Sequence, residues 1–237
     1  MRWSSCGLGA GLSLFLLLPT IAAGKSKVEN WNARIQETVG LLRSGNAPQA
    51  RATIGVVLDE MAQSVAPGKK SGHAFGLALM LRALAEAGTG NEREATWDWH
   101  LAQQLDPPLE SWDLREFGVA GEILDRHRLS RDPVPPAPKG DDLEKEGGQK
   151  PTVSKRQRQP SYVENARLRR WQGTLVIVVR VDANGLPTYP RLEQTSDELS
   201  MVLDTCEFAR GLTFEPARRN GEPIAAMWDL TVNYRLQ

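Results

Sequence analysis

The stretch from Trp171 to Gly185 constrains the fold more than any other part of this 237-residue chain. Five of the eight residues from Thr174 to Val181 are Val or Ile, which is typical of a β-strand. Alternate residues form one fully apolar face, made of Leu175, Ile177, Val179 and Val181. Val176 and Val178 make the other face half apolar, which predicts a central strand covered on both sides. The Asn-Gly pair that ends the stretch is typical of a turn.

The composition predicts a folded protein, and the sequence contains no recognisable catalytic pattern. Hydrophobic residues make up 41% of the chain, enough for a core, and the formal net charge is zero. The neutral balance gives no reason to expect nucleic acid or an anionic membrane surface as a partner. Cys6 lies in the N-terminal leader and leaves Cys206 alone, so the processed chain has no internal disulfide. We find no Ser/His/Asp, Cys/His or phosphate-binding Gly pattern, and we therefore expect no enzyme activity and no cofactor.

Residues 1–24 have the features of a secretory signal peptide. Arg2 gives a positive start, Leu8 to Leu18 is apolar, and small residues suit cleavage after Ala23 or Gly24. The alternative is an uncleaved inner-membrane anchor, although such a helix needs about 20 good apolar residues. Both interpretations place the rest of the chain in the periplasm of a Gram-negative cell.

Residues 25–130 predict an all-α domain. Apolar residues recur every three to four positions, which predicts helices at about 30–43, 48–61, 72–87, 92–105 and 111–127. Two helix pairs share a pattern, since Gly45 and Gly90 each precede an alanine by five residues. Ala95, Trp99, Ala102 and Pro107 have the spacing of a tetratricopeptide helix, so this domain resembles tetratricopeptide-type hairpins. That resemblance implies a groove for a peptide or protein. A plain helical bundle is the alternative.

The three histidines do not predict a metal site. His73, His100 and His127 have no cysteine and no carboxylate at the spacing of a metal-binding pair.

Residues 131–158 predict a disordered linker. The segment Asp132 to Pro138 holds four prolines and cannot be helical, and the residues that follow are mostly polar. Lys155, Arg156 and Arg158 form a short basic patch, which we interpret as a solvated linker end.

Residues 159–237 carry three short motifs: Gln-Pro-x-Tyr at Gln159 to Tyr162, Asp-x-x-Gly at Asp182 to Gly185, and Phe-x-Pro-Ala-x-x-x-Gly-x-Pro at Phe214 to Pro223. Through these motifs, residues 159–237 resemble the C-terminal domain of TonB, the energy transducer of Gram-negative envelopes. The sequence departs from the family where Tyr-Pro becomes Tyr162-Val163, and Leu212 replaces the usual Trp.

This resemblance implies an α+β domain with a three-stranded antiparallel sheet and two helices on one face. Its last strand lies at an edge, where a short extended peptide of an outer-membrane receptor adds by backbone pairing. Along that strand Trp228, Leu230, Val232, Tyr234 and Leu236 are predicted to face inward. The expected contact residues are Gln159, Tyr162, Asp229, Thr231, Asn233 and Arg235. The alternative is that these residues only hold the domain together.

Three functions follow from these features. The first is a periplasmic TonB-like protein that binds partner proteins or peptides in outer-membrane transport, with the helical domain as a second interaction module. The second is a complete energy transducer, anchored in the inner membrane by an uncleaved leader and coupled to a proton-driven motor. The third is a structural envelope protein without a receptor partner. The sequence leaves open a homo-oligomer and does not identify the partner.

Overall fold

The computed structural model describes residues 25–64, 71–154 and 160–236. The predicted leader (1–24) and the predicted contact residue Gln159 lie outside the described residues. The helices are α1 (Lys25–Arg43), α2 (Ala47–Ser64), α3 (Ser71–Gly88), α4 (Glu92–Leu105), α5 (Gly118–Arg126), α6 (Gly140–Lys145), α7 (Glu164–Leu168) and α8 (Leu199–Gly211), with 3-10 turns η1 (Pro107–Ser111) and η2 (Arg115–Phe117). The strands are β1 (Thr152–Val153), β2 (Gly173–Val181), β3 (Pro187–Gln194), β4 (Phe214–Glu215), β5 (Ala217–Arg219), β6 (Glu222–Ile224) and β7 (Ala226–Tyr234). The predicted α+β class is confirmed, with a helical N-terminal region and a mixed C-terminal region.

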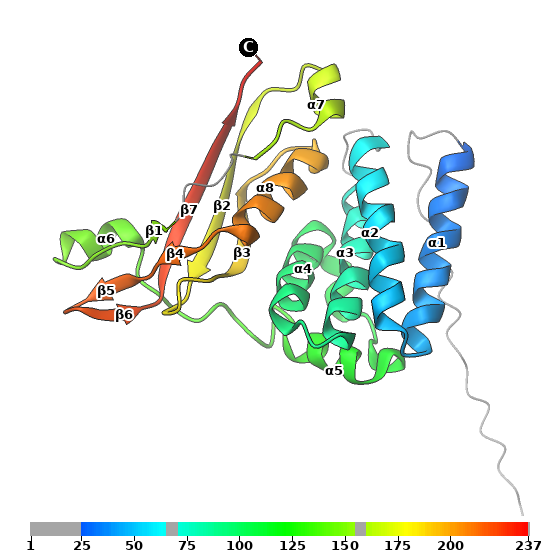
Figure 1. Ribbon diagram of the computed structural model, residues 1–237, viewed down its shortest axis with the longest axis horizontal. Coiled ribbons are helices and arrows are strands. Elements are labelled where there is room, and N and C mark those ends of the chain that lie inside the picture. The colour runs from blue at the N-terminus through cyan, green and yellow to red at the C-terminus, as the bar shows by residue number, and fades with distance from the viewer. Residues whose placement is uncertain (1–24, 65–70, 155–159, 237) are drawn as a thin grey trace, which may run out of the picture.

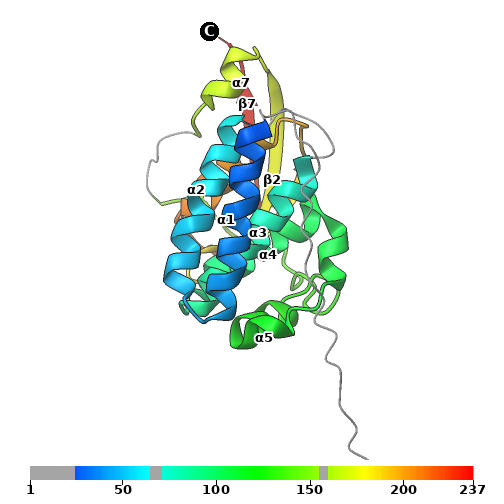
Figure 2. The same cartoon turned by 90° about the vertical axis from the view of Figure 1, so that its right-hand side faces the viewer.

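The helical region consists of two helical hairpins followed by α5. Helices α1 to α4 stand side by side, and α5 crosses one end of them (Figures 1 and 2). Both hairpin turns contain a glycine with positive φ, Gly45 at 76° and Gly90 at 81°. In each turn the glycine N–H bonds back to the preceding helix, a common way to end a helix at a left-handed residue. The similarity of the two hairpins predicted from Gly45 and Gly90 is therefore also present in the backbone.

The fifth predicted helix begins later than expected. The sequence predicted a helix from about residue 111, whereas α5 starts at Gly118 after the 3-10 turns η1 and η2. Asp113 accepts the backbone N–H of Arg115 at 3.1 Å, which favours a local turn over a helix. Gly118 has a φ of 55°, outside the helical region, and so fixes where the helix begins.

The three long strands form one antiparallel sheet in the order β3-β2-β7. Strand β2 is central, as its apolar sequence predicted, and it pairs with β7 along its whole length from Gly173–Tyr234 to Val181–Ala226. The β2 face formed by Leu175, Ile177, Val179 and Val181 is buried throughout. On the second face Val178 is buried but Val176 is only partly so, which corrects the expectation of full cover on both sides.

Helices α7 and α8 lie on the buried face of the sheet, as the resemblance implied, and α8 also faces the helical region (Figure 1). The apolar residues of α8, including Val202, Cys206 and Ala209, belong to the same continuous core as Trp31 of α1 and Trp99 of α4. The burial of Cys206 raises the pKa of its thiol, so Cys206 acts as a small apolar core residue. One core therefore joins the two regions.

The segment 131–154 is ordered, which corrects the predicted disordered linker. Helix α6 buries Leu143 completely against Ala217 and Ala226. Strand β1 pairs with β4, and Gln149 forms a bridge with Arg218. The composition pointed to disorder because the segment has few apolar residues, yet one buried leucine and backbone pairing suffice to hold it on the sheet.

None of the helices in the described ranges is long and apolar enough to cross a membrane.

Candidate functional site

The outer edge of β7 is the candidate site. The side chains of β7 alternate as predicted: Asp229, Thr231 and Asn233 are exposed, and the residues between them face the core. Trp228 packs on Phe214 with ring centroids 4.9 Å apart, and Tyr234 packs on Trp171 at 5.7 Å. These aromatic contacts pack β7 against the rest of the domain.

The backbone of β7 offers hydrogen-bonding groups on the side away from β2. The N–H of Met227 donates to the carbonyl of Pro138 at 2.8 Å, so it points away from the sheet. Backbone groups alternate in direction along a strand, and those of Asp229, Thr231 and Asn233 therefore point the same way. Within the described residues, no strand or loop pairs with these three on that side. The edge can accept one more strand.

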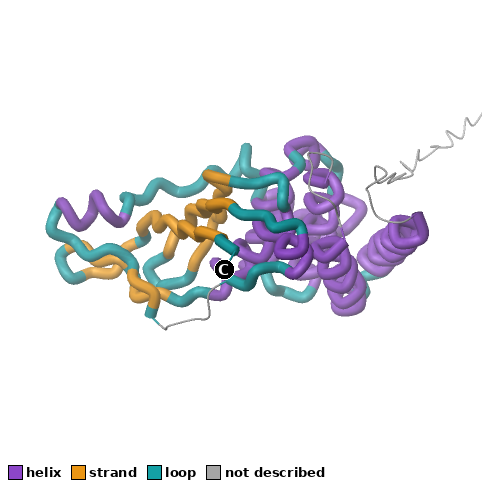
Figure 3. The backbone as a smooth tube through the Cα atoms, turned by 90° about the horizontal axis from the view of Figure 1, so that it is seen from above, coloured by secondary structure: helices purple, strands orange, loops and turns teal. Residues whose placement is uncertain are grey.

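The opposite edge of the sheet is closed by the helical region. The side-chain amide of Gln104 in α4 donates to the carbonyl of Pro190 at 2.7 Å and accepts the N–H of Leu192 at 2.9 Å. Gln104 thus pairs with β3 as a neighbouring strand would. In Figures 1 and 3 the helical region lies on the β3 side, and β7 lies on the far side of the sheet. Among the described residues, β7 is therefore the edge of the sheet that is left unpaired.

Tyr162 and Arg235 lie beside one pocket at the C-terminal end of β7. The ring of Tyr162 packs edge-on against Tyr234, with centroids 5.6 Å apart. Its hydroxyl oxygen is buried and has no hydrogen-bond partner among the described residues, and burial raises the pKa of this phenol. Tyr162 and Arg235 line one open pocket of about 670 Å³. Two of the predicted residues thus share a cavity.

Other predicted residues lie along the strand. Asn233 also has a structural contact, because its side-chain oxygen accepts the hydroxyl of Thr174 at 2.6 Å. Asp229 and Thr231 are exposed and lie opposite Val178 and Val176 of β2.

Sequence reasoning missed two residues near these edges. Arg170 lines the same pocket as Tyr162, and Gln104 closes the far edge. The sequence did contain a signal for the pocket. A few residues after the Gln-Pro-x-Tyr motif there is a basic cluster, made of Arg167, Arg169 and Arg170. Nothing in the local sequence marks Gln104, because its contact joins residues 86 positions apart.

His73 lies apart from the other two histidines, whereas His100 and His127 are neighbours that both lie near Asp132. His73 contacts Asp106 at 2.7 Å, and His127 contacts Asp132 at 2.7 Å. His100 is buried against Tyr189 with ring centroids 5.1 Å apart, and burial lowers its pKa to about 4. The described residues contain no group of three or more side chains able to hold a metal ion.

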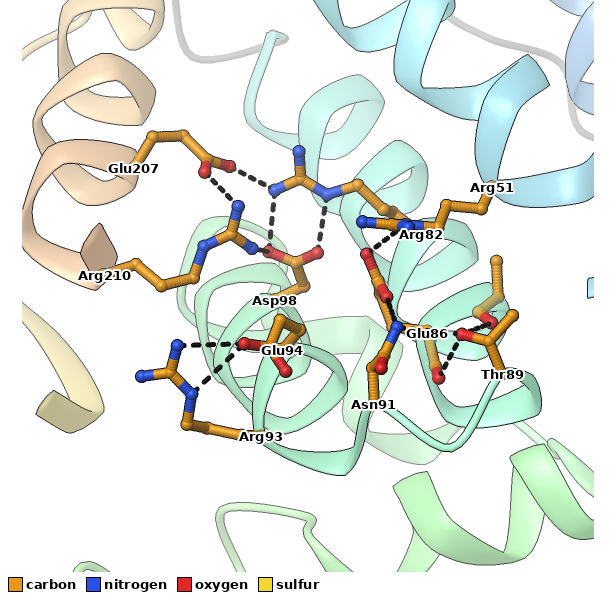
Figure 4. A network of polar contacts seen from close by, with 11 residues as sticks. Arg51, Arg82, Glu86, Thr89, Asn91, Arg93, Glu94, Asp98, Glu207 and Arg210 are labelled. Carbon is orange, nitrogen blue, oxygen red and sulfur yellow. Dashed lines mark hydrogen bonds and ion pairs between the residues drawn. The ribbon is translucent and has the colours of Figure 1, made fainter. Parts of the chain in front are cut away.

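A charge network fastens α8 to the helical region (Figure 4). The fully buried carboxylate of Asp98 in α4 accepts two bonds from Arg82 of α3, at 2.6 and 2.7 Å. Arg210 of α8 approaches Asp98 at 3.4 Å, and Glu207 of α8 binds both arginines. Burial would lower the pKa of Arg82, but the two carboxylates outweigh it and raise the pKa, so the guanidinium stays charged.

Comparison with known proteins identifies the C-terminal region. Residues 158–236, about a third of the chain, match the family described as Gram-negative bacterial TonB protein C-terminal. The match begins and ends close to the domain predicted from the sequence. No tetratricopeptide family matched the helical region. A search of curated proteins found no match.

Proposed function

Because residues 158–236 match the TonB C-terminal domain, we propose that this chain binds an extended peptide of a partner protein at the free edge of β7. The partner is an outer-membrane receptor or another periplasmic protein, and the setting is transport across the cell envelope. No reaction and no cofactor are involved. The contact residues are Tyr162, Asp229, Thr231, Asn233 and Arg235, together with Gln159, which lies outside the described residues.

The open backbone of β7 is the observation that carries this proposal. The outward N–H and carbonyl groups of Asp229, Thr231 and Asn233 form a template on which an extended peptide gains main-chain hydrogen bonds. Strand β7 is already paired with β2 along its whole length, so the template does not have to form when a peptide binds, which lowers the entropy cost of binding. Exposed polar and charged side chains along the edge also limit uncontrolled pairing.

A proline at Thr231 tests strand addition. Heptapeptides are first selected from a random display library on the intact chain. We predict that Thr231→Pro weakens their binding about tenfold, because it removes an outward N–H and its hydrogen bond. Affinities are measured by isothermal titration calorimetry, and circular dichroism checks the fold.

Thr231→Ala is the matched control. It removes the side chain but keeps the N–H, so we expect its affinity to stay within about twofold of the wild type. Selected peptides that bind Thr231→Pro as tightly as the wild type would contradict the proposal. Peptide binding that protects only the helices from hydrogen exchange would also contradict it.

Export to the periplasm is the second part of the proposal. It is supported by the apolar run from Leu8 to Leu18 and the small residues near Ala23, all outside the described residues. Mass spectrometry of the mature N-terminus tests it, and we expect a start at Gly24 or Lys25. A chain that retains Met1 or Arg2 in the membrane fraction would favour the anchored energy transducer instead.

A further inference from the structure

We propose that residues 138–149, the strap, act as a stop that fixes the register of a peptide paired with β7. This inference rests on the proposed strand addition and concerns what positions the peptide along the edge. The strap contains α6 and lies in the chain between the helical region and β1. It leaves a peptide the outward groups from Asp229 to Asn233, which pair with a segment of about five residues.

Backbone pairing by itself does not fix where a peptide begins on the edge. The outward N–H and carbonyl groups of a strand repeat every second residue, so a peptide that slips by two residues finds the same kind of bond. A buried apolar face is what usually specifies register, whereas Asp229, Thr231 and Asn233 are exposed and polar. A stop at one end of the edge supplies the missing reference point.

The strap occupies the edge of β7 at Met227. The N–H of Met227 donates to the carbonyl of Pro138 at 2.8 Å, and Lys139 and Met227 form a parallel bridge. The strap then leaves the edge at once, because α6 begins at Gly140. Helix α6 lies on the side of β7 that faces away from β2 (Figure 1). A peptide that lies along Asp229 therefore meets the strap at its next step toward the start of β7.

The point where the strap leaves the edge is tightly packed. Gly140 is buried, and a Cβ on it would lie 3.0 Å from the Cβ of Lys150 and 3.5 Å from the carbonyl oxygen of Met227. The backbone of the strap thus lies directly against β7. A peptide cannot pass between them, so it has to end or turn away at this point.

A small core of its own holds the strap in place. Leu143 of α6 is fully buried in a cluster with Ala217 and Ala226, and this cluster is separate from the main core. Gln149 and Arg218 exchange two backbone hydrogen bonds, of 2.8 and 2.9 Å. Because these contacts are separate from the main core, a change at Leu143 should loosen the strap and leave the rest of the fold closed.

Disulfide trapping measures the register on the intact chain. Thr231→Cys keeps the backbone N–H and places a thiol on the edge. Seven versions of the tightest display-selected heptapeptide, each with one cysteine at a different position, are incubated with it in a glutathione buffer. A disulfide needs Cα atoms within about 7 Å, which excludes a peptide residue two positions out of register. Cys206 is buried, and mass spectrometry identifies the bonded cysteines. We expect one peptide position to dominate.

Two further variants release the stop. Leu143→Ser places a hydroxyl in the small core, and the second variant replaces residues 139–148 with a Gly-Ser linker of equal length. In both, two peptide positions that lie two residues apart should share the disulfide. A heptapeptide extended by two residues at the strap end should also bind about fivefold more tightly in calorimetry, because Met227 becomes free to pair, whereas the wild type should show no gain. Val119→Ser, at an exposed valine of α5, is the control and should keep one register.

The outcomes distinguish this inference from the proposed function. If heptapeptides bind and weaken in Thr231→Pro but occupy several registers on the wild-type strap, strand addition stands and the stop is overturned. A single register that persists in both released variants, with no gain from the longer peptide, overturns the stop as well. If no heptapeptide binds at millimolar concentration, the proposed function and this inference are both overturned.

Discussion

Gly185 shows how a single residue fixes the turn after the central strand. Its φ is 81°, and a Cβ at this position would lie 2.0 Å from the carbonyl oxygen of Phe214. Its own carbonyl accepts the N–H of Phe214 at 2.9 Å, so the two backbones cannot separate without losing that bond. We predict that Gly185→Ala destabilises the protein by about 3 kcal/mol or more, measured by urea denaturation.

Gly221 gives the matched control for this prediction. It has a similar φ of 85°, but a Cβ there would meet nothing within 4 Å. Gly221→Ala should therefore cost only the conformational strain, about 1 kcal/mol. Equal losses in the two variants would show that the contact with Phe214 is unimportant.

The lowered pKa of His100 predicts that the stability of the protein depends on pH. Burial lowers its pKa from 6.5 to about 4, so the unfolded chain binds more protons than the folded chain between these values. Stability is therefore complete above about pH 6.5 and is lost as the pH falls toward 4, by up to about 3 kcal/mol. His100→Phe keeps a flat ring against Tyr189 but does not titrate. We expect the variant to lose less stability over this range in chemical denaturation, and parallel curves would contradict the prediction.

The two edges of the sheet differ at the scale of the element. The amide of Gln104 closes the edge of β3, whereas in the described part of the chain no backbone group pairs with the outer side of β7 from Asp229 to Asn233. We predict that Gln104→Leu destabilises the protein by about 2 kcal/mol, because it leaves the carbonyl of Pro190 and the N–H of Leu192 without these partners. The open β3 edge should also promote association at high concentration, measured by light scattering.

Gln104→Glu sharpens this experiment. It keeps the acceptor for Leu192 but loses the donor to Pro190, so its loss of stability should be intermediate between that of the wild type and Gln104→Leu. A Gln104→Leu protein as stable as the wild type would mean that α4 does not protect this edge.

Local patterns predicted the elements well. The alternation along β2 and β7 and the apolar spacing of α8 are set by residues close in sequence, and a period of two or of three to four identifies them directly. The late start of α5 was missed, because its boundary depends on the backbone of Gly118 and the turn at Asp113. The order of 131–154 was missed because Leu143 is a single apolar residue whose pocket comes from distant strands.

Local sequence patterns could not predict the contacts between the two regions. Asp98 and Gln104 resemble solvent-facing residues, and their partners Arg210 and Pro190 lie 112 and 86 positions away. One signal was present: Trp97, Trp99 and Leu101 make α4 apolar on more than one side, which indicates a helix covered by two layers. The candidate contact residues came from the family resemblance, whereas the position of Arg170 beside the pocket depends on the geometry of α7.

At the scale of the whole molecule, the helical region and the TonB C-terminal domain are packed as one body. The shared core and the Asp98 network join α8 to α3 and α4, while β7 faces away from them (Figures 1 and 4). A partner that bound at β7, as proposed, would therefore be attached to a unit that includes the helices. We expect residues 25–236 to unfold in one cooperative transition, because separating the regions would expose part of a common core.

A substitution at Asp98 tests whether the two regions unfold as one unit. Its carboxylate is fully buried between Arg82 and Arg210, so Asp98→Asn leaves two guanidinium groups with less compensating charge and should cost about 3 kcal/mol. Glu94→Gln, which breaks the more exposed pair with Arg93, should cost less than about 1 kcal/mol. Differential scanning calorimetry measures both, and the ratio of calorimetric to van't Hoff enthalpy reports cooperativity. Two separate transitions in the wild type, or equal losses in the two variants, would show that the regions are only tethered.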